Sequence, residues 1–214
     1  MAKLYFRYGA MNSGKSTALL QAAYNYEERG QRVLLAKPQI DTKGDEDVVS
    51  RLGVTRHVDF LVGHDADLRE LFHRAASNAH PDSAHRDLEV SCLLIDEAQF
   101  LTTEQVDDLM RIAVLDNVPV MCYGIRTDFQ TRAFPGSARL LEIAHTLEEL
   151  KTICRCGKKA LFNGRTVDGT FVFSGSQVAI DGVHVGYESL CANCYLEESG
   201  GVLLPRIDIK AEFH

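Results

Sequence analysis

What the sequence lacks excludes several classes of protein. No apolar run approaches the roughly 20 residues that a membrane-spanning helix needs. The first residues lack the long apolar core and the cleavage site of a secretory signal peptide, so a cytoplasmic location is expected. Basic stretches are missing as well, and the net charge of −7 argues against a large nucleic-acid-binding surface. We therefore expect neither a membrane nor a nucleic acid as a partner.

The first 150 residues alternate between apolar runs and segments with helical spacing. These segments follow one another at 3–8, 15–29, 33–36, 68–76, 90–98, 104–115 and 118–124. Strands that are apolar throughout are typical of a parallel sheet covered on both faces. Residues 38–57 are polar and irregular, which favours a flexible loop. The sequence thus predicts an α/β fold, a parallel sheet like that of P-loop NTPases with helices on both faces.

The character of the chain changes near residue 150. After about Glu149, cysteines, glycines and short extended runs take over. Asp168-Gly169 lies between two extended runs, a pattern typical of a hairpin turn. We place a domain boundary near residues 148–152, which gives one domain over 1–150 and a small β-rich lobe over 151–214.

A phosphate-binding motif follows the first predicted strand. Residues 9–16 match the pattern G-x-x-x-x-G-K-[ST] and open the first predicted helix. The loop consists of Gly9, Ala10, Met11, Asn12, Ser13, Gly14, Lys15 and Ser16. Its backbone N–H groups can surround a polyphosphate at the positive end of the helix dipole. Lys15 is expected to reach the β- and γ-phosphates of ATP, and Ser16 to ligate Mg²⁺. The alternative is a glycine-rich turn before a helix.

Two acidic residues end the buried strand at 90–98. An aspartate there is the usual anchor for the Mg²⁺ of a P-loop, and ligands bind at the carboxyl ends of such strands, so Asp96 can face the same site. The adjacent Glu97 can act as the general base for an acceptor hydroxyl. The alternative is that Glu97 only caps the loop that follows.

Four of the six cysteines form two close pairs in the C-terminal lobe. The pairs are Cys154 with Cys156, and Cys191 with Cys194. In a cytosolic chain such pairs suggest a metal more than disulfides, and four thiolates suit tetrahedral Zn²⁺. A structural zinc would supply the stabilisation that the small apolar core of such a lobe cannot. Four unrelated reduced thiols are the alternative. Cys92 and Cys122 lie in apolar runs and are expected to be buried.

Together these segments resemble a known family, the thymidine kinases that combine a P-loop domain with a zinc-binding lobe. The resemblance covers nearly the whole chain and rests on GAMNSGKS at 9–16, KPQIDTK at 37–43, IDEAQF at 95–100, YGIRTDFQ at 123–130, the four cysteines and GYESLCANCY at 186–195. It implies transfer of the γ-phosphoryl group of ATP to the 5′-hydroxyl of thymidine, giving thymidine monophosphate for DNA precursor salvage. It also implies a homotetramer that thymidine triphosphate inhibits.

The resemblance implies a role for individual residues, with Glu97 as the general base. Besides the P-loop, the positions that contact the nucleotide match Asp41, Thr42, Lys43, Asp96, Glu97, Ala98 and Gln99. The positions that contact thymidine match Met11, Phe100, Phe129, Val178, Ala179, Ile180, Asp181, Gly182 and Tyr187. Residues 178–182 belong to a loop that closes over the base in this family, although Asp181-Gly182 by itself is typical of a hairpin turn. Lys43 stands where many members carry Arg, and the Cys154–Cys156 spacing is shorter than in some members.

Two other classes of protein fit parts of the sequence. Residues 96–99 read DEAQ, which is similar to the DEAx box of nucleic-acid-dependent ATPases, but the chain is acidic and has no room for a second motor domain. A zinc-stabilised nucleotide sensor without chemistry would keep the P-loop and the cysteines and would not need Glu97. A nucleoside kinase is the leading hypothesis of the three.

Overall fold

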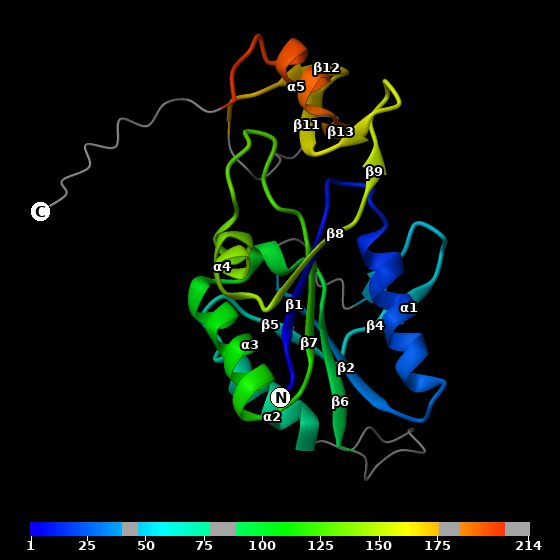
Figure 1. Ribbon diagram of the computed structural model, residues 1–214, viewed down its shortest axis with the longest axis vertical. Helices are drawn as coiled ribbons and strands as arrows, with labels where there is room; N and C mark the ends of the chain where they lie inside the picture. The colour runs from blue at the N-terminus through cyan, green and yellow to red at the C-terminus, as the bar shows by residue number, and fades with distance from the viewer. Residues whose placement is uncertain (40–46, 78–88, 176–184, 204–214) are drawn as a thin grey trace, which may run out of the picture.

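The computed structural model describes residues 1–39, 47–77, 89–175 and 185–203. A six-stranded sheet forms the centre of the larger domain, in the order β5-β2-β6-β7-β1-β8 (Figure 1). Its strands are β1 Leu4–Tyr8, β2 Arg32–Pro38, β5 Phe60–Val62, β6 Val90–Ile95, β7 Val120–Gly124 and β8 Thr146–Glu149. Every neighbouring pair is parallel, as the continuous apolar runs predicted.

Helices cover both faces of this sheet (Figure 1). They are α1 Lys15–Glu27, α2 Leu68–Ser77, α3 Thr103–Leu115 and α4 Pro135–Ile143. On one face α1 buries Leu19, Leu20 and Ala23 against β2 and β6. On the other face α2, α3 and α4 pack over a larger apolar cluster that includes Phe6 and Phe72. The predicted α/β architecture with two covered faces is confirmed.

Helix α3 begins at a capping box, which explains its sharp start. The Thr102 hydroxyl accepts the backbone N–H of Gln105, and the Gln105 side chain accepts the N–H of Thr102. The Gln105 amide also donates to backbone carbonyls that follow β5, at 2.8 Å from the oxygen of Gly63. This side chain therefore fixes α3 to the loop that follows an edge strand.

The interpretation of residues 38–57 as an irregular loop was wrong for 47–57. There, β3 Asp47–Val49 and β4 Thr55–His57 form an antiparallel hairpin. The Ser50 N–H closes its turn by donating to the carbonyl of Val54 at 2.8 Å. Val48 is buried in the cluster beneath α1, so one apolar side chain holds the hairpin on the domain.

The C-terminal lobe lies at one end of the sheet and begins directly after β8 (Figure 1). Its elements are β9 Thr152–Ile153, β10 Lys159–Ala160, β11 Phe162–Val167, β12 Thr170–Val172, β13 Val185–Leu190 and α5 Ala192–Glu198. Strand β11 pairs antiparallel with both β12 and β13. Asp168 and Gly169 have φ values of 48° and 81°, which confirms the predicted hairpin turn. None of the helices in the described ranges has the length and hydropathy that a membrane crossing requires.

Candidate active site

The P-loop joins the carboxyl end of β1 to the first turn of α1. Asn12 and Gly14 have φ values of 65° and 76°, a left-handed conformation that glycine adopts freely and asparagine tolerates. At Gly9 an added Cβ would lie 2.5 Å from the carbonyl oxygen of Leu150, so only glycine fits there. Lys15 Nζ donates to the Ala10 carbonyl at 3.0 Å. Burial lowers the pKa of Lys15, and the charges of Glu97 and Asp96 oppose that change.

Asp96 lies at the end of β6, directly beside the P-loop. The Ser16 hydroxyl donates to Asp96 Oδ2 at 3.3 Å, so the two residues predicted to handle Mg²⁺ are in contact. Asp96 is only 5% exposed. Burial, and then the charge of Glu97, raise the pKa of Asp96 to about 6. A cation beside Asp96 would favour the charged form of its carboxylate and oppose this increase.

Glu97 occupies a strained backbone position between β6 and the 3₁₀ helix η1, Ala98–Phe100. Its φ is 51°, in the left-handed region, and such strain persists where surrounding contacts hold it. The Gln99 side-chain amide donates to the Glu97 carboxylate, and Gln99 Oε1 accepts the backbone N–H of Ile125 at 3.2 Å. Gln99 is buried beneath this contact, as is Ala98 beside it. Gln99, held by the residue that follows β7, thus orients the Glu97 carboxylate.

A cleft of about 1440 Å³ joins the P-loop and Glu97 to an apolar wall. Its polar side includes Lys15, Ser16 and Glu97. Its apolar side includes the described residues that the resemblance assigned to thymidine, namely Met11, Phe100, Phe129 and Tyr187. The volume exceeds the roughly 300–1,000 Å³ of a pocket for one small ligand, so it can hold two ligands side by side.

Several predicted site residues lie outside the described residues. They are Asp41, Thr42, Lys43, Val178, Ala179, Ile180, Asp181 and Gly182. Their predicted contacts with nucleotide and base stay predictions.

The structure also places residues at the cleft that no motif had indicated. Arg51, in the turn between β3 and β4, lines the cleft and adds positive charge near Lys15. Asp128 lines it as well, and its carboxylate accepts the backbone N–H groups of Gln130 and Arg132 at 2.8 and 2.9 Å. Asn163 reaches the cleft from β11 in the lobe. The sequence of the TDFQ segment could have indicated Asp128, but nothing local singled out Arg51 or Asn163.

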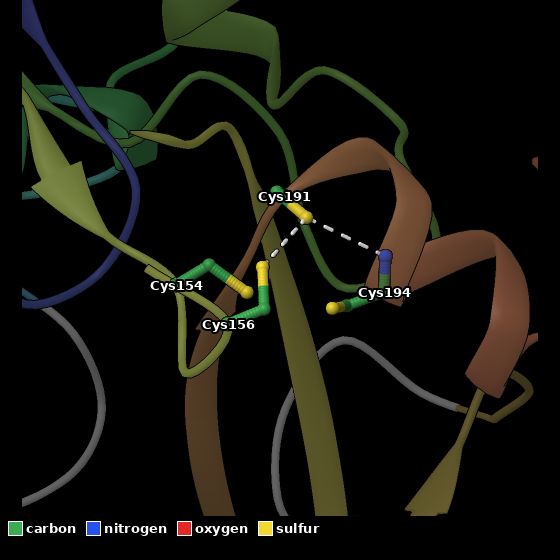
Figure 2. Close-up of side chains that lie close together, drawn as sticks. All are labelled: Cys154, Cys156, Cys191 and Cys194. Carbon is green, nitrogen blue, oxygen red and sulfur yellow. Dashed lines mark hydrogen bonds between the residues drawn. The ribbon is translucent and has the colours of Figure 1, made fainter. Parts of the chain in front are cut away.

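The four paired cysteines converge in the lobe (Figure 2). The sulfur atoms of Cys154, Cys156, Cys191 and Cys194 all lie within 4.8 Å of one another. Tetrahedral coordination at a Zn–S distance near 2.3 Å would separate such sulfurs by roughly 3.8 Å, so the cluster fits a zinc ion. The backbone N–H of Cys194 donates to the Cys191 sulfur at 3.5 Å and holds the pKa of that thiol at about 7, below its usual range.

Comparison with known proteins shows the family of this chain. The family described as Thymidine kinase matches residues 2–195. A thymidine kinase of Idiomarina loihiensis is 48% identical over 94% of this chain and 99% of the relative. Thymidine kinases of Enterobacteria phage T4 and Mesorhizobium japonicum are also 48% identical, over 89% and 94% of this chain and 94% of each relative. The chain belongs to the thymidine kinase family.

Proposed function

We propose that this chain is an ATP:thymidine 5′-phosphotransferase, which makes thymidine monophosphate and ADP for DNA precursor salvage. One observation supports the reaction above all others. Lys15, Glu97 and the apolar pair Met11 and Phe129 line the same cleft, so a phosphate donor and the hydroxyl of a nucleoside whose base packs on the apolar pair can meet beside one carboxylate.

On the donor side, the P-loop N–H groups and Lys15 bind the β- and γ-phosphates of ATP. Ser16 and Asp96 would hold Mg²⁺, since their hydroxyl and carboxylate oxygens are in contact and are ligands that Mg²⁺ prefers. When bound, Mg²⁺ neutralises charge on the transferring phosphoryl group. Asp41, Thr42 and Lys43 are proposed as further contacts to the nucleotide, on the resemblance alone.

On the acceptor side, Glu97 is the general base. Its carboxylate accepts the proton of the thymidine 5′-hydroxyl as that oxygen bonds to the γ-phosphorus and the bond to the ADP oxygen breaks. The hydrogen bond from Gln99 and the strained backbone fix the direction of this carboxylate. Positioning of this kind is the main contribution that a protein makes to phosphoryl transfer.

Thymidine is proposed to bind against Met11, Phe100, Phe129 and Tyr187, with residues 178–182 over the base. Phe100 packs edge-on against Phe134, with ring centroids 5.4 Å apart, which stiffens one side of this wall. The Arg165 guanidinium lies 5.1 Å from the centroid of the Phe129 ring, which helps to hold this second aromatic side chain in place. Rigid aromatic side chains suit a flat pyrimidine ring with a methyl group.

The four cysteines are proposed to hold one structural Zn²⁺. All four positions of a tetrahedral ion would be filled by sulfur, which leaves none open for catalysis. We also propose a division at residues 148–152, with 1–150 as the catalytic domain and 151–214 as the zinc lobe. Strand β8 ends at Glu149 and β9 begins at Thr152, which supports this boundary.

The assembly and its regulation are proposed from the resemblance. The chain is expected to form a homotetramer in the cytoplasm and to be inhibited by thymidine triphosphate. That nucleotide carries a thymine ring and a triphosphate in one molecule, so it suits a cleft with an apolar wall and a phosphate loop. It would then compete with both substrates.

A labelling experiment tests the proposed reaction. The purified chain is incubated with ATP labelled on the γ-phosphate and with thymidine, deoxyuridine, deoxycytidine or adenosine, each with and without DNA. Label on the 5′-oxygen of thymidine, independent of DNA, is the expected result. Release of labelled phosphate only in the presence of DNA would instead identify a nucleic-acid-dependent ATPase. Binding of ATP with neither outcome would identify a nucleotide sensor.

A further inference from the structure

Side chains of the C-terminal lobe hold three successive peptide groups of the P-loop. Asn163 Oδ1 accepts the backbone N–H of Met11 at 2.7 Å. The Ser189 hydroxyl donates to the carbonyl of Met11. The Thr152 hydroxyl donates to the carbonyl of Asn12 at 3.3 Å. The peptide groups that follow residues 10, 11 and 12 are therefore each bonded to a residue beyond the proposed domain boundary.

Asn163 uses both ends of its amide in this contact. Its Nδ2 donates to the carbonyl of Thr127 at 3.0 Å, in the segment between β7 and α4 that carries Phe129. The side chain is only 3% exposed, so removing it would leave two partly buried backbone groups without this partner. The lobe reaches the same segment again through Tyr195, whose hydroxyl donates to the carbonyl of Phe129 at 2.6 Å. The lobe thus bonds both walls of the cleft.

The shape of a P-loop decides how well it binds phosphate, because its N–H groups must point at the ligand. Asn12 adopts the left-handed conformation, which asparagine tolerates better than most residues and which contacts with neighbouring groups can stabilise further. Within the loop itself, only a long bond from the Ser13 N–H to the Ala10 carbonyl, at 3.3 Å, crosses this turn among the described backbone contacts. The lobe bonds the peptide groups on both sides of Asn12 and the peptide group before Met11.

We infer that the lobe sets the shape of the P-loop, and that Asn163 and Ser189 are positioning residues for ATP through the Met11 peptide groups. This inference rests on the proposed role of the P-loop as the ATP site. It assigns the lobe a task on the donor side of the reaction, in addition to its proposed contacts with thymidine.

The test uses Asn163→Ala and Ser189→Ala in the full-length, metal-loaded chain. Each removes side-chain bonds to Met11, so the dissociation constant for ATP should rise about fivefold to tenfold in Asn163→Ala and a little less in Ser189→Ala. The backbone amide of Met11 should also exchange with solvent faster in Asn163→Ala. Labelling with ¹⁵N-methionine isolates this amide, since the chain has only four methionines.

Two controls separate positioning from general destabilisation. Asn193→Ala removes an amide in the same lobe that bonds only to Glu197 among its described partners. Ser137→Ala removes a buried hydroxyl that donates to a backbone carbonyl at 2.6 Å, as Ser189 does, but at Ile125 rather than at the P-loop. Both controls should change the melting temperature alone and leave ATP affinity and the Met11 amide unchanged.

Unchanged ATP affinity and unchanged Met11 exchange in both variants would overturn the inference, even if their melting temperatures fell. If Asn163→Ala does not fold, Ser189→Ala decides alone, because it removes a single oxygen atom. A wild-type chain that binds no ATP in the same titration would instead refute the proposed function, so the two failures are distinguishable.

Discussion

The sheet domain and the C-terminal lobe bury different kinds of side chain. In the sheet domain, two clusters of aliphatic and aromatic residues fill both faces of six parallel strands. Among the described residues of the lobe, the buried cluster has six members, and three of them are the proposed zinc ligands Cys154, Cys191 and Cys194. A core this small gives little stabilisation on its own, so metal coordination can replace apolar burial there.

The two regions also differ in the role of their polar side chains, which are catalytic in the sheet domain and hold the backbone in the lobe. Lys15, Ser16, Asp96 and Glu97 all come from strand ends and the first helix turn of the sheet domain. Asn163 and Ser189, from the lobe, form hydrogen bonds with backbone groups of the P-loop, and Asn163 also with the segment after β7. Variants of the catalytic side chains should therefore lower activity and leave the fold intact. Variants in the lobe should first disturb the structure of the lobe and the P-loop, and activity should fall as a consequence.

The largest effect is expected for Glu97→Gln. This change keeps the shape of the side chain and removes its proton affinity, so kcat should fall by roughly 10²–10⁴. Calorimetric titration should find ATP and thymidine still bound. Glu70→Gln, on the exposed surface of α2, provides the matched control and should turn over normally. Weakened binding with normal turnover at saturation would give Glu97 a structural role.

Lys15→Ala should cost roughly 10²–10³ in turnover, because it removes one charged donor to the phosphates. Its melting temperature should stay close to that of the wild type, since the ammonium serves ligand charge rather than packing. Thermal unfolding and the labelled-ATP assay on one preparation measure both quantities, with Lys3→Ala as the control. Near-normal activity of the variant would contradict the proposed role of Lys15 in phosphate binding.

Cys191→Ser tests whether the lobe depends on a bound metal for its stability. The wild type should carry about one Zn²⁺ per chain, and the variant should lose it along with the order of the lobe. Cys92→Ala removes a buried thiol of the sheet domain instead and should keep the metal. Elemental analysis of freshly purified protein decides, and a wild type without zinc would refute the proposed metal site.

The smallest effect concerns the ion pair between Arg69 of α2 and Asp116 at the end of α3. A hydrogen bond from Arg69, at 2.7 Å, and one from His73 hold the pKa of Asp116 at about 2. A depressed carboxyl pKa stabilises the fold above the unfolded value near 3.9 and loses that contribution as pH falls towards 2. Asp116→Asn should therefore be slightly less stable than the wild type at pH 7. The difference in melting temperature should shrink below about pH 4, and a constant difference would contradict this account.

Helices and strands could be predicted where a short stretch of sequence carries an apolar pattern or a motif of its own. Continuous runs such as 90–95 and the P-loop motif have signatures within a few residues. Helix α4 escaped prediction because its buried face includes Gly136 and Ser137, which by composition indicate a loop. A Cβ at Gly136 would lie 2.4 Å from the Ala98 carbonyl oxygen, so the close packing of α4 on η1 requires glycine there. The same glycine made the segment look like a loop in the sequence.

The site was predictable for residues with motifs and not for those that act through the backbone. Lys15, Ser16, Asp96 and Glu97 stand in recognisable patterns. Lys15, Ser16 and Glu97 line one cleft, and Asp96 accepts a hydrogen bond from Ser16 beside it. The hydrogen bond from the Met11 main-chain N–H to Asn163 Oδ1 joins positions 152 residues apart, so neither partner has a distinctive sequence signal.

Removal of the metal tests the central contrast between the two regions most directly. Hydrogen exchange is measured on the wild type before and after mild treatment with a zinc chelator. The amides of β11, β13 and α5 should lose protection, the P-loop amides should follow to a lesser degree, and β1, β6 and β7 should keep theirs. Equal protection throughout the chain before and after metal removal, or uniform loss in both regions, would contradict the account.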